Sequence, residues 1–378
     1  MKIIERKIDV IDGTPMEYLG GLKSFPVYMG CVSHGQEKDL RADMEWHISP
    51  TNGLLQLKNL IPLDVLYPEN HAGAVGGTWM KHHKAFANFV GRFSPNSVLE
   101  VGGAHGILSK IYKDQSKSVA WTILEPNPIP VEGVTARFIK GFFDDQFELN
   151  EEVDAVVHSH VFEHVYEPQT FVKHIAKFLS EGKHLIFTFP NMEVMLQRKY
   201  TNCINFEHTV FLTEPYVEYL LHQHGFRILE KEYFLDDHSV FYACVRDNNV
   251  EQTALPKGLY QKNKQAYLEY VPYHEELISE LNHKIAKLED GQKLYLFGAH
   301  VFAQYLIAFG LDKSRIECIL DNDPNKQGKR LYGTKLQVAS PKILEDVKKP
   351  VVILKAGVYN DEIKEDILKN VNTNTLFI

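Results

Sequence analysis

A short apolar strand that runs directly into a glycine-rich turn and a helix constrains this chain more than any other feature. The strand is Ser97-Val98-Leu99-Glu100-Val101, the turn is Gly102-Gly103-Ala104-His105-Gly106, and the helix begins at Ile107. Glycines let the backbone pass close to a ligand, and the first turn of a helix offers unpaired N–H groups. The segment therefore predicts the nucleotide-binding corner of a parallel α/β sheet.

Strands and helices continue to alternate after this corner, which favours an α/β fold with a doubly wound, Rossmann-like sheet. Two later apolar runs, residues 226–234 and 239–246, flank a short polar turn and predict a hairpin at the edge of that sheet. Further strands are expected at residues 120–124, 153–157 and 184–189, and a helix is expected at residues 168–179.

The pattern changes along the chain and predicts four parts. A second strand-and-turn segment, Leu294 to Ala299, begins a smaller Rossmann-like domain near the C-terminus. The expected parts are a β-rich N-terminal module (1–75), the α/β core (76–247), a polar helical linker (248–290) and the C-terminal Rossmann-like domain (291–378).

Composition excludes several classes of protein. The 378 residues carry a formal net charge of -8 without a basic run, so a nucleic acid is not an expected partner. The four cysteines are scattered, which argues against a disulfide framework or a zinc ribbon. No apolar run reaches the roughly 18 residues that span a membrane, and the N-terminus lacks a signal-peptide pattern. We therefore expect a cytoplasmic protein.

The glycine-rich turn favours an adenosine-type ligand. It lacks the G-x-G-x-x-G spacing of dinucleotide sites, which argues against NAD in this domain. Glu125 ends the second strand, where its carboxylate can accept hydrogen bonds from both ribose hydroxyls. Phe143 can pack on an adenine, and Asp144 can accept from the adenine amine. The alternative is that the glycines only form a tight turn. The expected cofactor residues are Glu100, Gly102, Gly103, Gly106, Glu125, Phe143 and Asp144.

With these motifs the sequence resembles a class I S-adenosylmethionine-dependent methyltransferase, and more closely the sugar C-methyltransferases that act on nucleotide-linked keto-deoxysugars. The resemblance covers nearly the whole chain, in the family's order of zinc module, methyltransferase core and Rossmann-like tail. It is carried by Tyr67 to His83 with Thr78-Trp79, by His160-Val161-Phe162-Glu163-His164-Val165, by Ile204-Asn205-Phe206-Glu207-His208, by Phe297-Gly298-Ala299 and by Leu320 to Gly328.

The resemblance implies a small-molecule acceptor, a nucleotide-linked or phosphorylated sugar, held between core and tail. His208 matches the base that removes a proton next to the keto group, and Glu207 would orient it. Such a base needs a pKa near neutrality, which suits histidine. The other residues implied are His164 for catalysis, His160 beside the cofactor, and His71, Asn205 and Lys326 for the acceptor.

The sequence departs from the family in the N-terminal module. Where the family has two C-x-x-C pairs, this chain has Asp9 to Gly13 and Ser49 to Gly53, so we expect no structural zinc. Asn205 replaces a family tyrosine. Three alternatives follow: an O-methyltransferase in which His208 deprotonates a hydroxyl, an inactive module that still binds the cofactor, and an NAD(P)-dependent sugar enzyme that uses the C-terminal turn.

Two further segments have more than one interpretation. His158, His160 and His164 are metal-ligand types, but we favour a pocket-lining role and expect no metal. The C-terminal turn and Asp321-Asn322-Asp323 either bind a second nucleotide or only shape the cleft. Three basic residues follow this turn closely and could bind a diphosphate: Lys326, Lys329 and Arg330. The alternative is that they are surface side chains without a binding partner.

Overall fold

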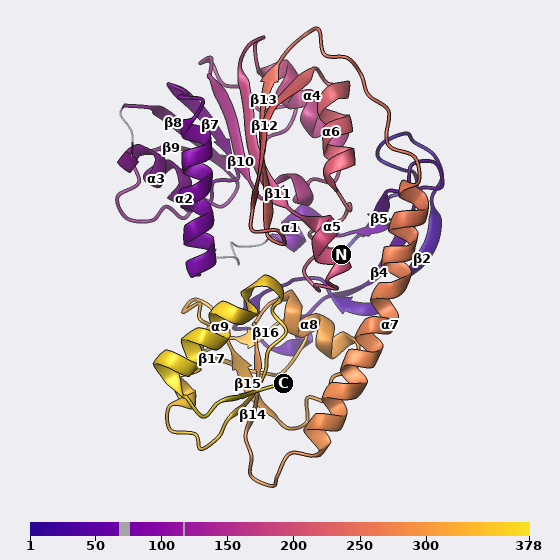
Figure 1. Cartoon of the computed structure of the whole chain (residues 1–378), viewed down its shortest axis with the longest axis vertical. Coiled ribbons are helices and arrows are strands. Elements are labelled where there is room, and N and C mark those ends of the chain that lie inside the picture. Colours follow the sequence, from indigo (N-terminus) through magenta and orange to yellow (C-terminus); the bar gives the residue numbers. More distant parts are fainter. Residues whose placement is uncertain (68–75, 116–117) are drawn as a thin grey trace.

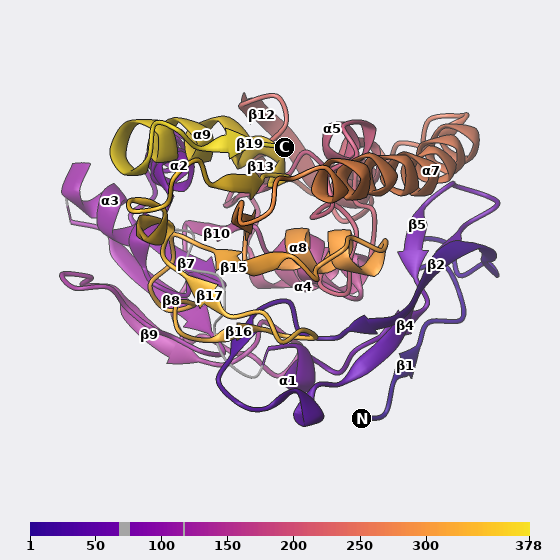
Figure 2. The same cartoon turned by 90° about the horizontal axis from the view of Figure 1, so that it is seen from below.

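A central sheet and a smaller C-terminal sheet form two lobes, and a β-rich N-terminal module lies against both (Figures 1 and 2). The computed structural model describes residues 1–67, 76–115 and 118–378. The expected α/β class, with a Rossmann-like core, a β-rich N-terminal module and a C-terminal Rossmann-like domain, is confirmed. Within the described residues, no helix is both long and apolar enough to cross a membrane.

The central sheet has seven strands in the order β12-β13-β11-β10-β7-β8-β9. Strands β7 to β11 are parallel, and β13 pairs antiparallel with both β11 and β12. The chain order reverses between β7 and β10, which is where ligands bind in open α/β sheets. The strands are β7 (Ser97–Val101), β8 (Ala120–Glu125), β9 (Arg137–Lys140), β10 (Ala155–Ser159), β11 (His184–Pro190), β12 (Phe226–Phe234) and β13 (Ser239–Arg246).

Apolar side chains on both faces of this sheet explain why helices cover each face. In β7, Val98 packs in the cluster under α2 (Gly77–Gly91) and α3 (Ile107–Gln115), while Leu99 packs in the cluster on the opposite face. Consecutive strand residues point to opposite faces, so such strands are apolar throughout. The opposite face is covered by α4 (Pro168–Phe178) and α6 (Glu214–Gln223) (Figure 1).

The C-terminal domain is built on a second, parallel sheet in the order β17-β15-β14-β18-β19. The long helix α7 (Leu259–Ala286) precedes it and runs beside both lobes (Figure 1). The strands of this domain are β14 (Leu294–Phe297), β15 (Ile316–Leu320), β17 (Val338–Ala339), β18 (Val351–Ile353) and β19 (Leu376–Phe377), and its helices include α8 (Val301–Ala308) and α9 (Asn360–Asp366). Two short helices, α1 (Leu63–Leu66) and α5 (Met192–Gln197), lie earlier in the chain.

The N-terminal module contacts the C-terminal domain through a pair of strands and an ion pair. Strand β3 (Cys31–Val32) pairs with β16 (Arg330–Leu331), and the buried Arg330 guanidinium lies 2.6 Å from the Asp39 carboxylate. Arg330 is therefore committed to the contact between domains, and this does not agree with a diphosphate role for it. The other strands are β1 (Ile4–Glu5), β2 (Glu17–Pro26), β4 (Arg41–Ile48), β5 (Leu55–Leu57) and β6 (Asn59–Leu60).

The two segments that replace the family's thiolate pairs meet through hydrogen bonds. Asp9 is 2% exposed, and its carboxylate accepts from the backbone N–H groups of Ile11 and Asp12 and from the amide of Asn52 at 2.9 Å. Asp12 accepts from the hydroxyl of Thr51 at 2.5 Å. These donors and acceptors satisfy one another and include no thiolate or imidazole, so they do not fit a structural zinc site.

Replacing Asp9 by alanine is expected to lower the free energy of unfolding by about 3 kcal/mol, because several buried donors would lose a charged acceptor. Urea denaturation followed by circular dichroism measures the change. Asp114→Ala, which removes a carboxylate that is 67% exposed, serves as the control and should change stability by less than about 0.5 kcal/mol. Equal effects of the two substitutions would contradict the role given to Asp9.

Candidate active site

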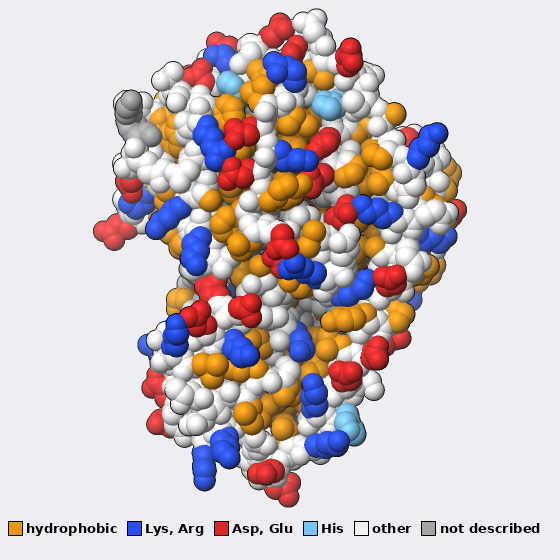
Figure 3. All heavy atoms as spheres, viewed as in Figure 1, with side chains coloured by type: hydrophobic (Ala, Val, Ile, Leu, Met, Phe, Trp, Pro, Cys, Tyr) orange, Lys and Arg blue, Asp and Glu red, His pale blue; other side chains and the backbone are white. Residues whose placement is uncertain are grey.

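A cavity of about 570 Å³ lies between the carboxyl ends of the central strands and the first turns of the C-terminal domain. The surface is hollowed between the two lobes (Figure 3). The cavity is lined from the core by Glu100, Gly102, Gly103, Glu125, His160, His164, Asn205, Glu207 and His208, and from the C-terminal domain by Phe297, Gly298, Asp321, Asn322, Asp323, Lys326 and Tyr359.

The turn after β7 requires glycine at three positions. Gly102 and Gly106 have φ values of +74° and +70°, a region that favours glycine. A Cβ added to Gly102 would lie 2.5 Å from Val161, and one added to Gly103 would lie 2.7 Å from the carboxyl carbon of Glu100. Gly102 and Gly103 line the cavity. The bare backbone of this turn fits the close approach of a nucleoside ligand.

Glu125 combines burial with acceptor capacity at the end of β8. Its side chain lines the cavity, and its two carboxylate oxygens accept from the backbone N–H groups of Ala104 at 3.2 Å and Asn127 at 2.9 Å. Each carboxylate oxygen has two acceptor positions, so each can accept one more hydrogen bond. This arrangement fits the two ribose hydroxyls of S-adenosylmethionine.

Glu100 is buried beside the same turn. The pKa of Glu100 is raised to about 7, mainly by burial and also by the charge on Glu125, whereas a hydrogen bond from the Trp121 indole at 2.7 Å acts in the opposite direction. A carboxyl group with this pKa is partly protonated at neutral pH. A nearby cation would favour the ionised form of this group.

The substitution Glu100→Gln is expected to stabilise the chain at high pH. Because the pKa of Glu100 is raised from 4.5 to about 7, the folded chain binds more protons than the unfolded chain between these values. The unfolding free energy of the wild type therefore falls as pH rises through this window. Glutamine resembles the protonated acid, so the variant should gain up to about 3 kcal/mol near pH 8 and nothing near pH 4.

Urea denaturation at both pH values measures this difference between Glu100→Gln and the wild type. Glu132→Gln changes an exposed glutamate and is the matched control. A pH-independent effect of Glu100→Gln would show that folding does not shift the pKa of Glu100.

The loop that carries His208 is held by backbone and amide groups. The Oδ1 atom of Asn205 accepts from the N–H groups of Glu207 at 2.8 Å and His208 at 3.0 Å. The Nδ1 atom of His208 lies 3.1 Å from the carbonyl oxygen of Cys203, to which it can donate. That tautomer leaves a lone pair on Nε2. His208 therefore has the hydrogen-bonding arrangement of a general base.

Glu207 lies beside His164 rather than against Nδ1 of His208, which differs from the expected orientation of His208 by Glu207. A Glu207 carboxylate oxygen is 3.9 Å from Nδ1 of His164, and the Tyr67 hydroxyl is 2.9 Å from the same nitrogen. Burial lowers the pKa of His164 to about 4, so the ring is neutral near pH 7. The rings of His164 and His208 have centroids 4.9 Å apart.

The other expected site residues have different surroundings. His160 lines the cavity and lies 3.0 Å from Glu163, and Lys326 lines it while pairing with Asp321 at 3.2 Å. Phe143 packs 4.6 Å, between ring centroids, from His174 of α4, and Asp144 is exposed; neither is among the residues that line the cavity. His71 lies outside the described residues.

Several cavity residues were not predicted from the sequence as site residues. Tyr67 and Trp79 belong to a stretch that resembles the family, but no role followed from it, and His238 lies in a turn that predicted only a hairpin. Tyr359 comes from the C-terminal domain. The aromatic character of the stretch from Tyr67 to His83 was the one available signal.

Family comparisons agree with this geometry. Residues 78–231 match the family described as "Methyltransferase domain", and residues 257–378 match the family described as "C-methyltransferase C-terminal domain". A search of curated proteins finds no match.

Solved structures match less than half of the chain. Magnesium protoporphyrin IX methyltransferase from Synechocystis PCC 6803, with bound SAH, is 15% identical, with 45% of this chain and 84% of that chain covered and a TM-score of 0.36. The N-methyltransferase NodS from Bradyrhizobium japonicum WM9, in complex with S-adenosyl-L-homocysteine, is 15% identical, with 46% and 89% covered and a TM-score of 0.36.

The two family matches follow one another in the order in which the core and the C-terminal sheet occur along the chain. The chain is therefore an S-adenosylmethionine-dependent methyltransferase that carries a methyltransferase domain followed by a C-methyltransferase C-terminal domain.

Proposed function

We propose that this enzyme methylates carbon next to a keto group in a nucleotide-linked or phosphorylated sugar. The observation that carries the proposal is the composition of the cavity. The turn after β7, the turn after β14 and the segment that carries His208 all line this cavity. An acceptor with a sugar at one end and a phosphate-bearing group at the other suits a cavity shared by two domains.

The turn after β7, with Glu100, Gly102, Gly103, Gly106 and Glu125, would hold the cofactor. When bound, S-adenosylmethionine supplies an electrophilic methyl group. The protein's task is then to generate a carbon nucleophile and to position it. Nε2 of His208 would take the proton from the acceptor carbon, which leaves the electron pair on that carbon to form the new C–C bond. His160 would lie beside the methionine part, and Phe143 and Asp144 remain proposals for the adenine.

The neighbouring groups would act on the acceptor. Neutral His164, held by the Tyr67 hydroxyl, can donate a hydrogen bond towards the keto oxygen, where negative charge develops. Glu207 would act on His164 through its charge, since its carboxylate lies 3.9 Å from Nδ1. Asn205 would serve the acceptor site by fixing the loop, and His71 remains a proposal. Lys326 would meet the phosphate-bearing end, so Lys326→Met should weaken the preference for a phosphorylated acceptor over the free sugar.

A methyl-transfer screen tests the proposal. The enzyme is incubated with S-adenosylmethionine carrying a ¹³C methyl group and with nucleotide-linked keto sugars, the matching sugar phosphates and the free sugars. We expect the label on the carbon next to the keto group of a phosphorylated acceptor. A label on oxygen would support the O-methyltransferase alternative. SAH binding without any transfer would support the inactive-module alternative.

A further inference from the structure

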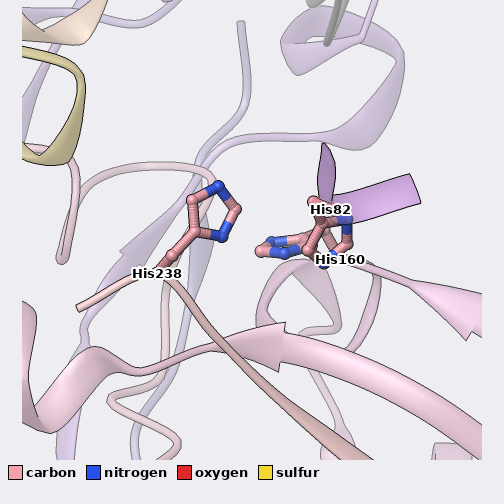
Figure 4. Close-up of side chains that lie close together, drawn as sticks. All are labelled: His82, His160 and His238. Atoms are coloured by element: carbon pink, nitrogen blue, oxygen red, sulfur yellow. The ribbon is translucent and has the colours of Figure 1, made fainter. Parts of the chain in front are cut away.

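Three histidines from separate parts of the core meet beside the cavity. His82 belongs to α2, His160 follows β10, and His238 lies in the turn between β12 and β13. Each offers a ring nitrogen within 4.8 Å of the nitrogens offered by the other two. Figure 4 shows the three side chains close together. The methyl-transfer mechanism proposed above gives no role to His82 or His238.

Two of these rings carry a buried nitrogen without a partner. His82 is 0% exposed and His238 is 1% exposed, yet Nδ1 of His82 and Nε2 of His238 make no hydrogen bond within the described part of the chain. Buried polar atoms normally have a partner, because leaving one unsatisfied destabilises the folded chain. Two such atoms in one cluster fit a site that binds a ligand.

The second nitrogen of each ring is held by a side chain. Nδ1 of His238 lies 2.5 Å from the Ser239 hydroxyl, and Nε2 of His82 lies 3.5 Å from the Thr188 hydroxyl. Nδ1 of His160 lies 3.0 Å from a Glu163 carboxylate oxygen. Metal-binding histidines are oriented in this way, with the nitrogen away from the metal bonded to an oxygen group.

In His160, unlike in the other two histidines, both ring nitrogens have a hydrogen-bonding neighbour. Its Nε2 lies 2.9 Å from the same Ser239 hydroxyl that meets His238. The Ser239 hydroxyl can rotate and keep only its contact with Nδ1 of His238. Nε2 of His160 would then be free to bind a metal. His160 also has a backbone φ of +53°, which is uncommon for a residue with a side chain. Strained conformations of this kind concentrate at functional sites.

We propose that His82, His160 and His238 form a three-histidine site for a divalent transition metal of the Zn²⁺ type. The sequence led us to expect no metal, so this assignment rests on the geometry alone. Zinc–nitrogen bonds of about 2.0–2.1 Å in a tetrahedron require nitrogens about 3.4 Å apart. The rings must therefore approach one another by up to about 1.4 Å, since their nitrogens lie within 4.8 Å.

The proposed site requires the three rings in their neutral form, because neutral imidazole is the form that binds a metal. Around the cluster, Glu163 and Asp237 provide carboxylates, and His83 adds a further imidazole.

The remaining coordination position would open to the active-site cavity. His160 and His238 line the cavity, together with Trp79 and Tyr359, whereas His82 is not among the lining residues. Three neutral ligands leave the double charge of the ion uncompensated. The open position would therefore take water or an oxygen of the acceptor, a ketone or its enolate by preference.

Metal binding can be measured without cofactor or acceptor, so this test is independent of the proposed function. The protein is prepared without a histidine tag, stripped with a chelator and titrated with Co²⁺, whose visible absorption reports tetrahedral coordination, and with Zn²⁺ by calorimetry. We expect binding of one ion per chain. We expect His82→Gln and His238→Gln each to weaken it by at least about 100-fold.

Two control variants locate the ion. His274→Gln alters a buried histidine of α7 whose Nδ1 meets the Tyr270 carbonyl at 2.8 Å, and it should bind as the wild type does. His208→Gln alters the second cluster of possible ligands, Glu163, His164 and His208. Loss of binding in His208→Gln but not in His82→Gln would overturn the proposal, as would a wild type that binds neither ion.

X-ray absorption at the zinc edge of the wild type provides a measurement that does not depend on variants. Three imidazole ligands and one oxygen ligand are expected. A carboxylate-rich shell with fewer than three imidazoles would overturn the assignment, even if His82→Gln and His238→Gln failed to fold.

Discussion

Replacing His208 by glutamine is expected to lower the rate of methyl transfer by roughly 10²–10⁴-fold, which is the usual contribution of a general base. Glutamine can still donate to the Cys203 carbonyl, which lies 3.1 Å from Nδ1 of His208, but it has no basic nitrogen. The loop should therefore keep its shape while proton removal from the acceptor carbon fails. Single-turnover kinetics with saturating acceptor measure the loss.

Binding measurements separate this effect from damage to the site. SAH affinity should be unchanged in His208→Gln, because His208 lies on a different segment from the turn after β7. His222→Gln, on the outer helix α6, is the matched control and should keep full activity. If His164→Gln abolished transfer while His208→Gln retained it, the base would be His164 and our assignment would be wrong.

Replacing Glu125 by alanine is expected to weaken SAH binding by at least about 100-fold. Hydrogen bonds to a charged acceptor each contribute about 1.5–3 kcal/mol, and two ribose hydroxyls would lose theirs. The N–H groups of Ala104 and Asn127 would lose the same acceptor, so the turn that faces the cofactor would also loosen. Titration calorimetry measures the change in Kd.

Graded variants of Glu125 test the cause of this loss. Glu125→Gln retains one acceptor oxygen and should lie between the wild type and alanine. Glu148→Ala removes an exposed carboxylate and should bind SAH normally. Wild-type affinity in Glu125→Ala would mean that the ribose is bound elsewhere.

Local sequence patterns predicted much of the fold. The strand Ser97–Val101 and the hairpin strands Phe226–Phe234 and Ser239–Arg246 have the predicted limits, because apolar periodicity and flanking turns are encoded locally. The strand expected at 153–157 is instead Ala155–Ser159. Its start is fixed by partners, since Ala155 pairs with Val98 on one side and His184 on the other. Register of this kind depends on tertiary contacts.

The candidate site was only partly predictable. Glycine at positive φ and an acid at a strand end are local features, so the turn after β7 and Glu125 could be recognised. Side chains of consecutive loop residues can point in different directions, so the adjacency of Glu207 and His208 in the sequence did not predict a contact between them. Glu207 lies near His164, and Nδ1 of His208 lies near the Cys203 carbonyl. His82 and His238 carry no local signal, because only the packing of α2 against the hairpin brings them together.

The most direct test of this account is a crystal structure of the enzyme with SAH. We predict that the adenosine occupies the cavity beside the turn after β7, with both ribose hydroxyls within hydrogen-bond distance of the Glu125 carboxylate. Adenosine bound instead at the C-terminal turn of Gly298, with Glu125 free of ligand, would contradict the assignment on which the roles of the other residues depend.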